Sequence, residues 1–274
     1  MPKKSTQKIT IGCDPELIIF DKKTRVRADA ILHRAEIFGC DGHSSTAELR
    51  PAAHNDTREV LNNIASLLMW FKETFPEYSL IAGAHVDGEP IGGHIHIGGT
   101  LYPELNDRLD KVFYALNILV EPEEQTKKRS SVGSYGQRKE FRRKPWGIEF
   151  RTPLSWLLSP YHALAYLGLA KLIVQYRDLD INKIYEEAAR KKLKPGTSRT
   201  TSDVNKAIMT VFMRDVLEQF STKAEEYDNT EEIIDIVECV QTVLTKTFDE
   251  FKWEENILEY WFQESDTLKI KIQE

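Results

Sequence analysis

The sequence lacks the features of a disulfide-linked, zinc-ribbon or membrane protein. Its three cysteines, Cys13, Cys40 and Cys239, are widely spaced and form no Cys-x-x-Cys pair, so we expect buried, reduced thiols. No apolar run approaches the roughly 18 residues of a membrane span. The amino terminus, MPKKSTQKIT, is basic but has no apolar signal segment, which predicts a cytoplasmic protein.

Several common catalytic motifs are also absent. The sequence contains no Gly-x-x-x-x-Gly-Lys-Ser/Thr loop, no Gly-x-Gly-x-x-Gly loop, no His-Glu-x-x-His pair and no nucleophile elbow. P-loop, Rossmann, zincin and serine-hydrolase mechanisms therefore have no support.

The charge is acidic overall but unevenly distributed. A net charge of −6 argues against a general nucleic-acid-binding protein. Between Thr126 and Lys144, however, a single acid, Glu140, stands against eight basic residues: Lys127, Lys128, Arg129, Arg138, Lys139, Arg142, Arg143 and Lys144. This basic run is a candidate anion site.

Polar residues two positions apart recur in four segments: Asp14-Pro-Glu16, Glu48-Leu-Arg50, His94-Ile-His96 and Glu149-Phe-Arg151. In a strand, residues i and i+2 share a face. Apolar residues alternate with these pairs, so the opposite face is predicted to be the packed one. Carboxylates crowded beside imidazoles are costly unless cations hold them together. The pattern predicts a metal-bearing active site spread across several strands.

Strand and helix patterns alternate in the first part of the chain. Strands are predicted over 8–13, 16–20, 46–50, 79–86, 91–98 and 147–152. The turn sequence Asp87-Gly-Glu-Pro90 predicts that 79–86 and 91–98 form an antiparallel hairpin. Helices are predicted to begin at Asp56 and near Pro103.

From Ser159-Pro160 onward the pattern is helical. The predicted helices span 160–177, 181–193, 203–227 and 231–262. We expect residues 1–157 to form a catalytic sheet region and residues 158–274 to form a helical part that packs on it, or that continues it as one domain.

Each candidate pair also has a structural interpretation. His94 and His96 lie between paired glycines, which favours a metal or phosphate site over structural histidines. Glu48 with Arg50 is equally compatible with a simple ion pair. Pro15 cannot donate to a ladder, which predicts a sheet edge or a bulge there. Asp41 and His43 are weaker candidates in a turn.

The segment from Arg142 to Arg151 joins the basic run to a strand that carries Glu149 and Arg151. A glutamate beside several guanidiniums is compatible with a structural anchor. If a metal is present, the same arrangement suits a phosphoryl group held between the cation and the arginines. Upstream, Arg129 and Ser134-Tyr-Gly136 lie in a loop able to wrap an anion.

Taken in order, these motifs resemble the glutamine synthetase and glutamate–cysteine ligase superfamily. Within it, residues 10–157 are most similar to the phage-type COOH·NH2 ligases, through these strings: Asp-Pro-Glu-Leu, Phe-Gly-x-Asp-Gly-His, Ala-Glu-Leu-Arg-Pro, Gly-Gly-His-Ile-His and Trp-Gly-Ile-Glu-Phe-Arg-Thr-Pro. The resemblance implies an α+β fold with an antiparallel catalytic sheet flanked by helices. It also implies that ATP and the carboxylate substrate enter at opposite ends, with residence in the host bacterial cytoplasm if the protein is phage-encoded.

The resemblance further implies two or three Mg²⁺ or Mn²⁺ ions. Asp14, His94 and Glu149 would hold the ion that bridges the ATP phosphates, and Glu16 and Glu48 the ion nearer the acceptor carboxylate. Arg142 and Arg151 would contact the transferring phosphoryl group, with Arg129 a weaker candidate, and His96 would contact the nucleotide. Asp14 stands where the wider superfamily has Glu, so the metal spacing is expected to differ.

The leading hypothesis is an ATP-dependent carboxylate–amine ligase that acts through an acyl-phosphate. A metal-dependent phosphotransferase, similar to guanidino kinases, and a nucleic-acid-binding module that uses the basic run are alternatives. Small-molecule and peptide carboxylates remain open as substrates. The sequence predicts neither the amine nor the oligomeric state.

Overall fold

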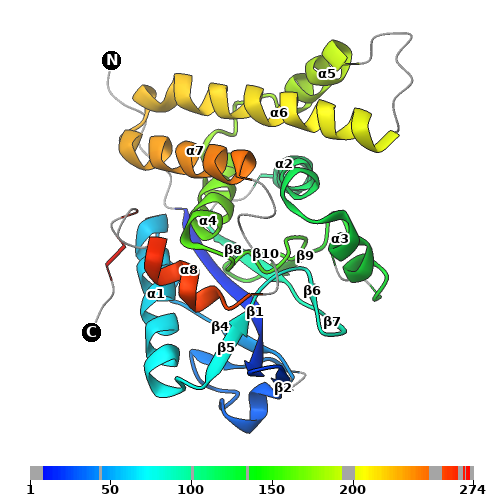
Figure 1. The fold of residues 1–274 in the computed structure, drawn as a ribbon. Coiled ribbons are helices and arrows are strands. Elements are labelled where there is room, and N and C mark those ends of the chain that lie inside the picture. The colour runs from blue at the N-terminus through cyan, green and yellow to red at the C-terminus, as the bar shows by residue number, and fades with distance from the viewer. Residues whose placement is uncertain are drawn as a thin grey trace.

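The computed structural model describes residues 9–42, 45–99, 102–133, 136–192, 201–246, 255–264, 268 and 270–271. Within them, an antiparallel sheet is flanked by helices, which confirms the expected α+β fold (Figure 1). No helix of this described part combines the length and apolar character needed to cross a membrane.

The longest strand, β1, organises the sheet. The strand order is β3-β4-β1-β8-β10-β9, and β2 and β5 also pair with β1. The strands of this sheet are β1 (Thr10–Asp21), β2 (Thr24–Val26), β3 (Phe38–Cys40), β4 (Ala47–Leu49), β5 (Tyr78–Ile81), β8 (Gly93–Gly98), β9 (Phe141–Lys144) and β10 (Gly147–Phe150). Two short strands, β6 (His85–Val86) and β7 (Glu89–Pro90), form a separate hairpin.

Two strand predictions are wrong. The predicted strands 8–13 and 16–20 form one strand, which contains Pro15 opposite Gly93 of β8. The ladder with β4 begins at Glu16, directly after the proline. The predicted hairpin between 79–86 and 91–98 does not form either, because β5 and β8 each pair with β1. The turn closes only the short β6–β7 hairpin.

The alternation in the sequence places the faces of the strands correctly. Cys13, Leu17, Ile95, Ile97, Ile148 and Phe150 are all buried. The Phe150 ring lies 5.3 Å from Phe113, which in turn lies 5.7 Å from Tyr166. These aromatic contacts join the sheet to two helices, so the apolar face is the packed face, as predicted.

Eight helices lie in the described part of the chain: α1 (Thr57–Thr74), α2 (Leu105–Val120), α3 (Glu123–Ser130), α4 (Pro160–Gln175), α5 (Ile181–Lys192), α6 (Thr201–Lys223), α7 (Thr230–Thr245) and α8 (Ile257–Glu264). Short 3₁₀ helices span Ala28–Ala30 and Ala224–Glu226. Asp56 caps α1 by accepting a hydrogen bond from Arg58 N, and Ser159 caps α4 at His162 N.

Helix α4 is the centre of the helical part. Nearly every residue of it is buried, which fits its apolar sequence. It contacts α1, α7, β1 and β8 (Figure 1). Gly168 allows the close approach of α7, since a Cβ there would lie 2.4 Å from Ile236 Cγ1.

The predicted helix over 231–262 is wrong. Helix α7 ends at Thr245, where Lys246 has an extended backbone, and α8 begins at Ile257. The helix prediction rests on an apolar series from Ile233 to Phe251, of which Ile233, Ile236, Val237, Val240 and Val243 are buried on α7. Phe248 and Phe251 lie outside the described residues.

Candidate active site

Strand pairing brings the predicted site residues into one row on the open face of the sheet. Glu16 lies opposite Glu48 on β4, and Asp14 lies opposite His94 on β8. On the other side of β8, Glu149 of β10 lies opposite His96. Directly opposed residues share a face and approach within about 5.5 Å between Cα atoms. Residues far apart in the chain therefore meet across four strands.

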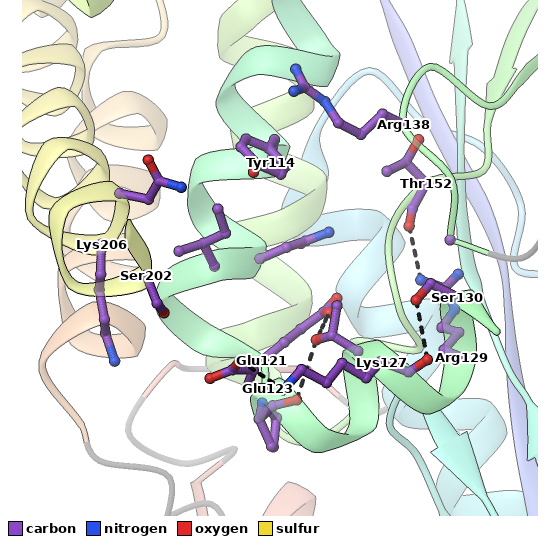
Figure 2. Close-up of a pocket in the computed structure, with 16 residues that line it drawn as sticks. Tyr114, Glu121, Glu123, Lys127, Arg129, Ser130, Arg138, Thr152, Ser202 and Lys206 are labelled. Carbon is purple, nitrogen blue, oxygen red and sulfur yellow. Dashed lines mark hydrogen bonds and ion pairs between the residues drawn. The ribbon is translucent and has the colours of Figure 1, made fainter. Parts of the chain in front are cut away.

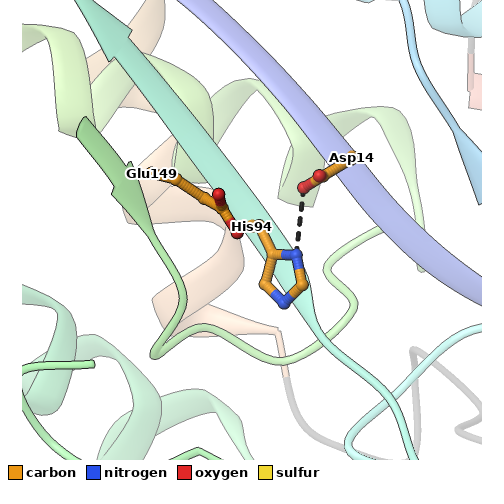
Figure 3. Close-up of side chains that lie close together, drawn as sticks. All are labelled: Asp14, His94 and Glu149. Atoms are coloured by element: carbon orange, nitrogen blue, oxygen red, sulfur yellow. Dashed lines mark ion pairs between the residues drawn. The ribbon is translucent and has the colours of Figure 1, made fainter. Parts of the chain in front are cut away.

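Asp14, His94 and Glu149 form the densest part of this row (Figure 3). One ligand atom from each lies within 4.8 Å of the others. Asp14 Oδ1 is 3.0 Å from His94 Nδ1 and 3.3 Å from His96 Nε2. Two carboxylates and a buried imidazole thus converge on one point.

The chemistry of this group fits a divalent cation. Asp14 Oδ1 and His96 Nε2 are buried, and apart from the ion-pair contacts of Asp14 with His94 and His96 they have no partner among the described residues. Carboxylate oxygens suit Mg²⁺ and Mn²⁺, and an imidazole nitrogen is compatible with Mn²⁺. Burial alone would raise the pKa of Asp14, but the adjacent imidazoles of His94 and His96 outweigh it and hold that pKa well below its usual range. Asp14 is therefore an ionised ligand at neutral pH.

Glu149 lies among three cationic side chains. Its carboxylate oxygens are 2.6 Å from Lys144 Nζ, 3.2 Å from Arg151 Nε and 3.7 Å from Arg142 Nη1. Arg142 lies opposite Glu149 on β9, and Lys144 lies opposite Gly147. Candidate metal ligands and cations that could bind phosphate therefore lie side by side at this point.

Lys144 was not singled out in the sequence as a site residue. The signal was available, because Lys144-Pro-Trp-Gly147 is a turn sequence that predicts a hairpin. That hairpin would have placed Arg142 and Lys144, two positions apart, on the face of Glu149.

Glu16 and Glu48 lie further along β1, and their environments differ from that of Asp14. Glu16 is buried, and its Oε2 accepts a hydrogen bond of 2.7 Å from Gly92 N. Burial raises the pKa of Glu16, partly offset by His94 and by that hydrogen bond. Burial and the charge of Asp14 raise the pKa of Glu48 to about 8, although Arg50 opposes the shift. Burial therefore favours the protonated form of both Glu16 and Glu48.

The ion pair between Glu48 and Arg50 is present. Arg50 also donates to the carbonyl oxygens of Glu36 at 2.9 Å and Cys40 at 3.1 Å. Arg50 therefore fixes Glu48 to the neighbouring loop, while the carboxylate still faces the open side of the sheet. The ion-pair and ligand interpretations of Glu48 are compatible.

A cavity of about 350 Å³ contains most of the row. It is lined by Asp14, Glu16, Asp41, Gly42, Glu48, His94, Gly136, Glu140, Arg142, Glu149 and Arg151. Glu140 was not predicted; its Oε1 lies 3.6 Å from Arg151 Nη1. Asp41 lines the cavity, whereas His43, Ser134 and Tyr135 lie outside the described residues.

Two predicted residues do not line this cavity. Arg129 is 3% exposed and donates to the carbonyl oxygens of Thr152 at 2.9 Å and Pro153 at 2.8 Å. His96 lies beside Asp14, and its ring is 5.2 Å from that of Trp146. Arg129 thus holds the backbone after β10, and His96 borders the metal-ligand group.

The strand directions define two ends of the site. Gly98 and Gly147 are paired at one end of β8, next to the half-exposed Trp146. At the other end, β8 begins at Gly93, near Glu16. The Asp14–His94–Glu149 group lies between these ends.

The sequence profile of the phage phiEco32-like COOH·NH2 ligase family, type 2, matches residues 11–247. The chain belongs to this family. It is thus a member of a family of carboxylate–amine ligases, which form amide bonds. No curated protein sequence matches it.

Two solved structures resemble the fold. The crystal structure of the complex between prokaryotic ubiquitin-like protein Pup and its ligase PafA aligns with a TM-score of 0.55 and 14% identity. The alignment covers 95% of this chain and 66% of that chain. A bifunctional glutathione synthetase from Pasteurella multocida aligns with a TM-score of 0.42 and 12% identity, over 96% of this chain and 50% of that one. The first alignment supports the fold.

Proposed function

We propose that this family member is an ATP-dependent ligase that forms its amide bond through an acyl-phosphate. The single observation that carries the proposal is the meeting of Asp14, His94 and Glu149 with three cations, Lys144, Arg151 and Arg142. Metal ligands that adjoin phosphate-binding cations suit the transfer of a phosphoryl group.

The proposed reaction has two steps. A carboxylate oxygen of the substrate attacks the γ-phosphorus of ATP, and the bond to the β-γ bridging oxygen breaks, which releases ADP. An amine nitrogen then attacks the activated carbonyl carbon, loses a proton and expels phosphate. No nucleophile of the protein is needed, so the chain contributes positioning and charge.

Each part of the row has a proposed role. Asp14, His94 and Glu149 would hold an ion for the phosphates, and Glu16 and Glu48 would hold one for the acceptor carboxylate. When bound, these ions neutralise the charge of the phosphates and of the group in transfer.

Arg142 and Arg151 donate to the transferring phosphoryl group. Arg151 is the stronger assignment, because only 18% of its side chain is exposed and it lines the cavity. Arg129 is a weaker one, since its guanidinium already donates to two carbonyl oxygens.

The two ends of the site suit opposite entry of the substrates. We assign the adenine to the end at Trp146, whose exposed ring offers a stacking surface beside His96. The carboxylate is assigned to the end at Glu16 and Glu48. The triphosphate would then cross the metal-ligand group.

The alternatives predicted from the sequence have less support. Several cations of the basic run are paired with acids outside the metal cavity: Lys127 with Glu123, Arg138 with Asp110, and Lys139 with Asp107. A nucleic-acid surface would need such charges for phosphates. A phosphotransferase would use the same cavity, but it would release ADP without an amine.

Calorimetry of ATP binding, with Mg²⁺ and with a chelator, tests the proposal. We expect binding to weaken at least tenfold without the ion, because the crowded acids repel the triphosphate. Equal affinity in both conditions would contradict the metal assignment.

A screen of carboxylates with amines, read by ADP release and by a product lighter than its substrates by one water, then tests the reaction. ADP release that needs no amine would favour the phosphotransferase.

A further inference from the structure

A second cavity, of about 450 Å³, lies outside the metal site (Figure 2). Its walls come from α2, α3, the start of α6 and the loop that contains Gly136 and Arg138. Tyr114, Ile118 and Pro122 supply apolar surface, while other lining residues are charged. No role in the proposed reaction has been given to it so far.

A buried carboxylate in this cavity is incompletely satisfied. Glu121 follows α2 and is 6% exposed. Its Oε2 accepts a hydrogen bond of 2.5 Å from Thr126 Oγ1, whereas its Oε1 is buried and has no hydrogen-bond partner among the described residues. Such an acceptor is costly unless a donor reaches it.

Of the four cations that line the cavity, three have partners, and the fourth, Lys206, is exposed on the α6 wall. Lys127 Nζ lies 2.9 Å from Glu123, and Arg138 Nη2 lies 2.6 Å from the buried Asp110. Arg129 donates to the carbonyl oxygens of Thr152 and Pro153. Glu121 therefore keeps one unmatched acceptor oxygen. Burial raises the pKa of this carboxyl group, partly offset by the charge of Arg129 and the hydrogen bond from Thr126, and a cationic donor would favour its ionised form.

The second cavity adjoins the metal cavity. Gly136 lines both of them. Its φ of +65° favours glycine, and a Cβ there would lie 2.8 Å from Arg129 Nη1. On the other side of Arg129, a Cβ on Gly92 would lie 3.4 Å from Nη2, and Gly92 N binds Glu16. The guanidinium of Arg129 thus separates Glu121 from the Glu16 end of the metal site.

We propose that this second cavity binds the amine substrate, and that the substrate is an aliphatic diamine or diamino acid whose distal ammonium group donates to Glu121. Its apolar stem lies along Ile118 and Tyr114, and its second amine faces Gly136 and the metal cavity. This inference rests on the proposed function, because it assigns the amine of that reaction.

The two amines of such a substrate would meet opposite charges. The ammonium beside Glu121 is stabilised in its protonated form. The amine that faces the metal cavity lies near Arg151 and the bound ions, which favour its neutral, nucleophilic form. A monoamine would lack the anchor at Glu121.

Calorimetry of the full chain with putrescine and butylamine tests the inference. We expect putrescine to bind the wild type at least tenfold more tightly than butylamine. Glu121→Gln keeps the shape and an acceptor for Thr126 but removes the charge, so we expect at least a tenfold loss of putrescine affinity. Glu123→Gln, a matched change in the same cavity, should stay within about twofold.

A second variant keeps the test decisive if Glu121→Gln does not fold. Ser202 is exposed on the opposite wall, so Ser202→Trp should fold and narrow the cavity. We expect it too to weaken putrescine binding at least tenfold. No binding to the wild type, or equal binding by the wild type and the folded variants, would overturn the inference.

The same samples are titrated with Mg²⁺ and ATP, which separates this inference from the proposed function. Putrescine binding without ATP binding would contradict the proposed function alone. Mg²⁺-dependent ATP binding without putrescine binding would contradict the amine site alone.

Discussion

Lys144 Nζ lies 2.6 Å from Glu149 Oε2, so a lysine contacts a carboxylate that also belongs to the Asp14–His94–Glu149 group. The side chain of Lys144 is 36% exposed, whereas that of Glu149 is 4% exposed. The lysine can therefore move into solvent while the glutamate stays in place. Lys144 and a divalent ion bound at this group would compete for the same carboxylate.

Replacing Lys144 by Met should tighten Mg²⁺ binding in the absence of nucleotide. The change removes a competing charge but keeps most of the side-chain volume. Since the pair is partly exposed, we expect a gain of about 1 kcal/mol or less, which is up to about fivefold in affinity. Titration calorimetry with Mg²⁺ alone measures it. Lys127→Met, which changes an exposed lysine of α3, is the control. Equal Mg²⁺ affinities of the wild type and both variants would show that Lys144 does not compete with the ion.

Much of the site could be predicted from the sequence because it depends on a local rule. Alternation alone placed Asp14 and Glu16 on the open face, with Cys13 and Leu17 buried behind them. It also placed the side chain of Glu149 on the other face of the sheet from the packed side chain of Ile148. Face assignment needs only neighbouring residues, so no knowledge of strand pairing is required.

Strand order could not be predicted in this way. The Asp87–Pro90 turn closes a hairpin, but which strands it joins depends on the pairing of β5 and β8 with β1, which is far away in the chain. Pro15 was expected at an edge or a bulge. It lies inside β1, and the ladder with β4 begins one residue later, at Glu16, so its missing N–H interrupts no bond to β4. Such pairing is decided by tertiary packing.

The ends of helices are also poorly predicted from a long apolar pattern. The apolar series from Ile233 to Phe251 has the period of a single helix, yet Lys246 is extended and α8 begins only at Ile257. The Glu121 cavity was missed for another reason: its walls come from α2, α3 and α6, and no local motif marks it. The division of the chain at residue 157 stays a prediction.

The stability of the metal-free protein should fall as pH rises from about 5 to 8. The pKa of Glu48 is raised from 4.5 to about 8, so in this interval the folded state binds more protons than the unfolded state. The free energy of unfolding then decreases with increasing pH. Glu16, whose pKa is also raised by burial, adds to the same trend.

Urea denaturation at several pH values, with a chelator present, measures this slope. Glu48→Gln removes the titrating group, so its slope between pH 5 and 8 should be flatter than that of the wild type. Equal slopes would mean that Glu48 does not hold its proton in the folded protein.

His162 should give the opposite trend at lower pH. Burial, helped by Lys246, lowers the pKa of His162 from 6.5 to about 3. Between these values the unfolded chain takes up a proton that the folded chain excludes, so stability is lost as pH falls. In the same denaturation series, His162→Gln should flatten the slope between pH 3 and 6.5 and leave the slope above pH 7 unchanged. A wild-type slope in this variant would exclude His162 as the cause.

Arg151 and Arg50 each follow a site glutamate by two positions, but their surroundings differ. Arg151 lines the metal cavity beside Glu149 and Glu140. Arg50 binds Glu48 and the carbonyl oxygens of Glu36 and Cys40. The same spacing thus places one arginine at the proposed phosphoryl group and the other in a structural network.

Replacement of each arginine by lysine should therefore have a different effect at the two positions. Arg151→Lys keeps the charge but loses the planar donor geometry, so we expect kcat to fall at least tenfold, with little change in KM for ATP or in stability. Arg50→Lys loses hydrogen bonds to two carbonyl oxygens and should lower the free energy of unfolding by about 2 kcal/mol. It should also raise the Mg²⁺ concentration needed for half-maximal rate, because Glu48 is less well held.

Urea denaturation and a Mg²⁺ titration of kcat on both variants measure these effects, once a substrate pair has been found in the screen. The wild type is the reference for both arginines, and each variant is the control for the other. If Arg151→Lys loses stability while its kcat at saturating Mg²⁺ is preserved, Arg151 is a structural partner of Glu149 and Glu140. Arg142, opposite Glu149 on β9, would then be the arginine that meets the phosphoryl group.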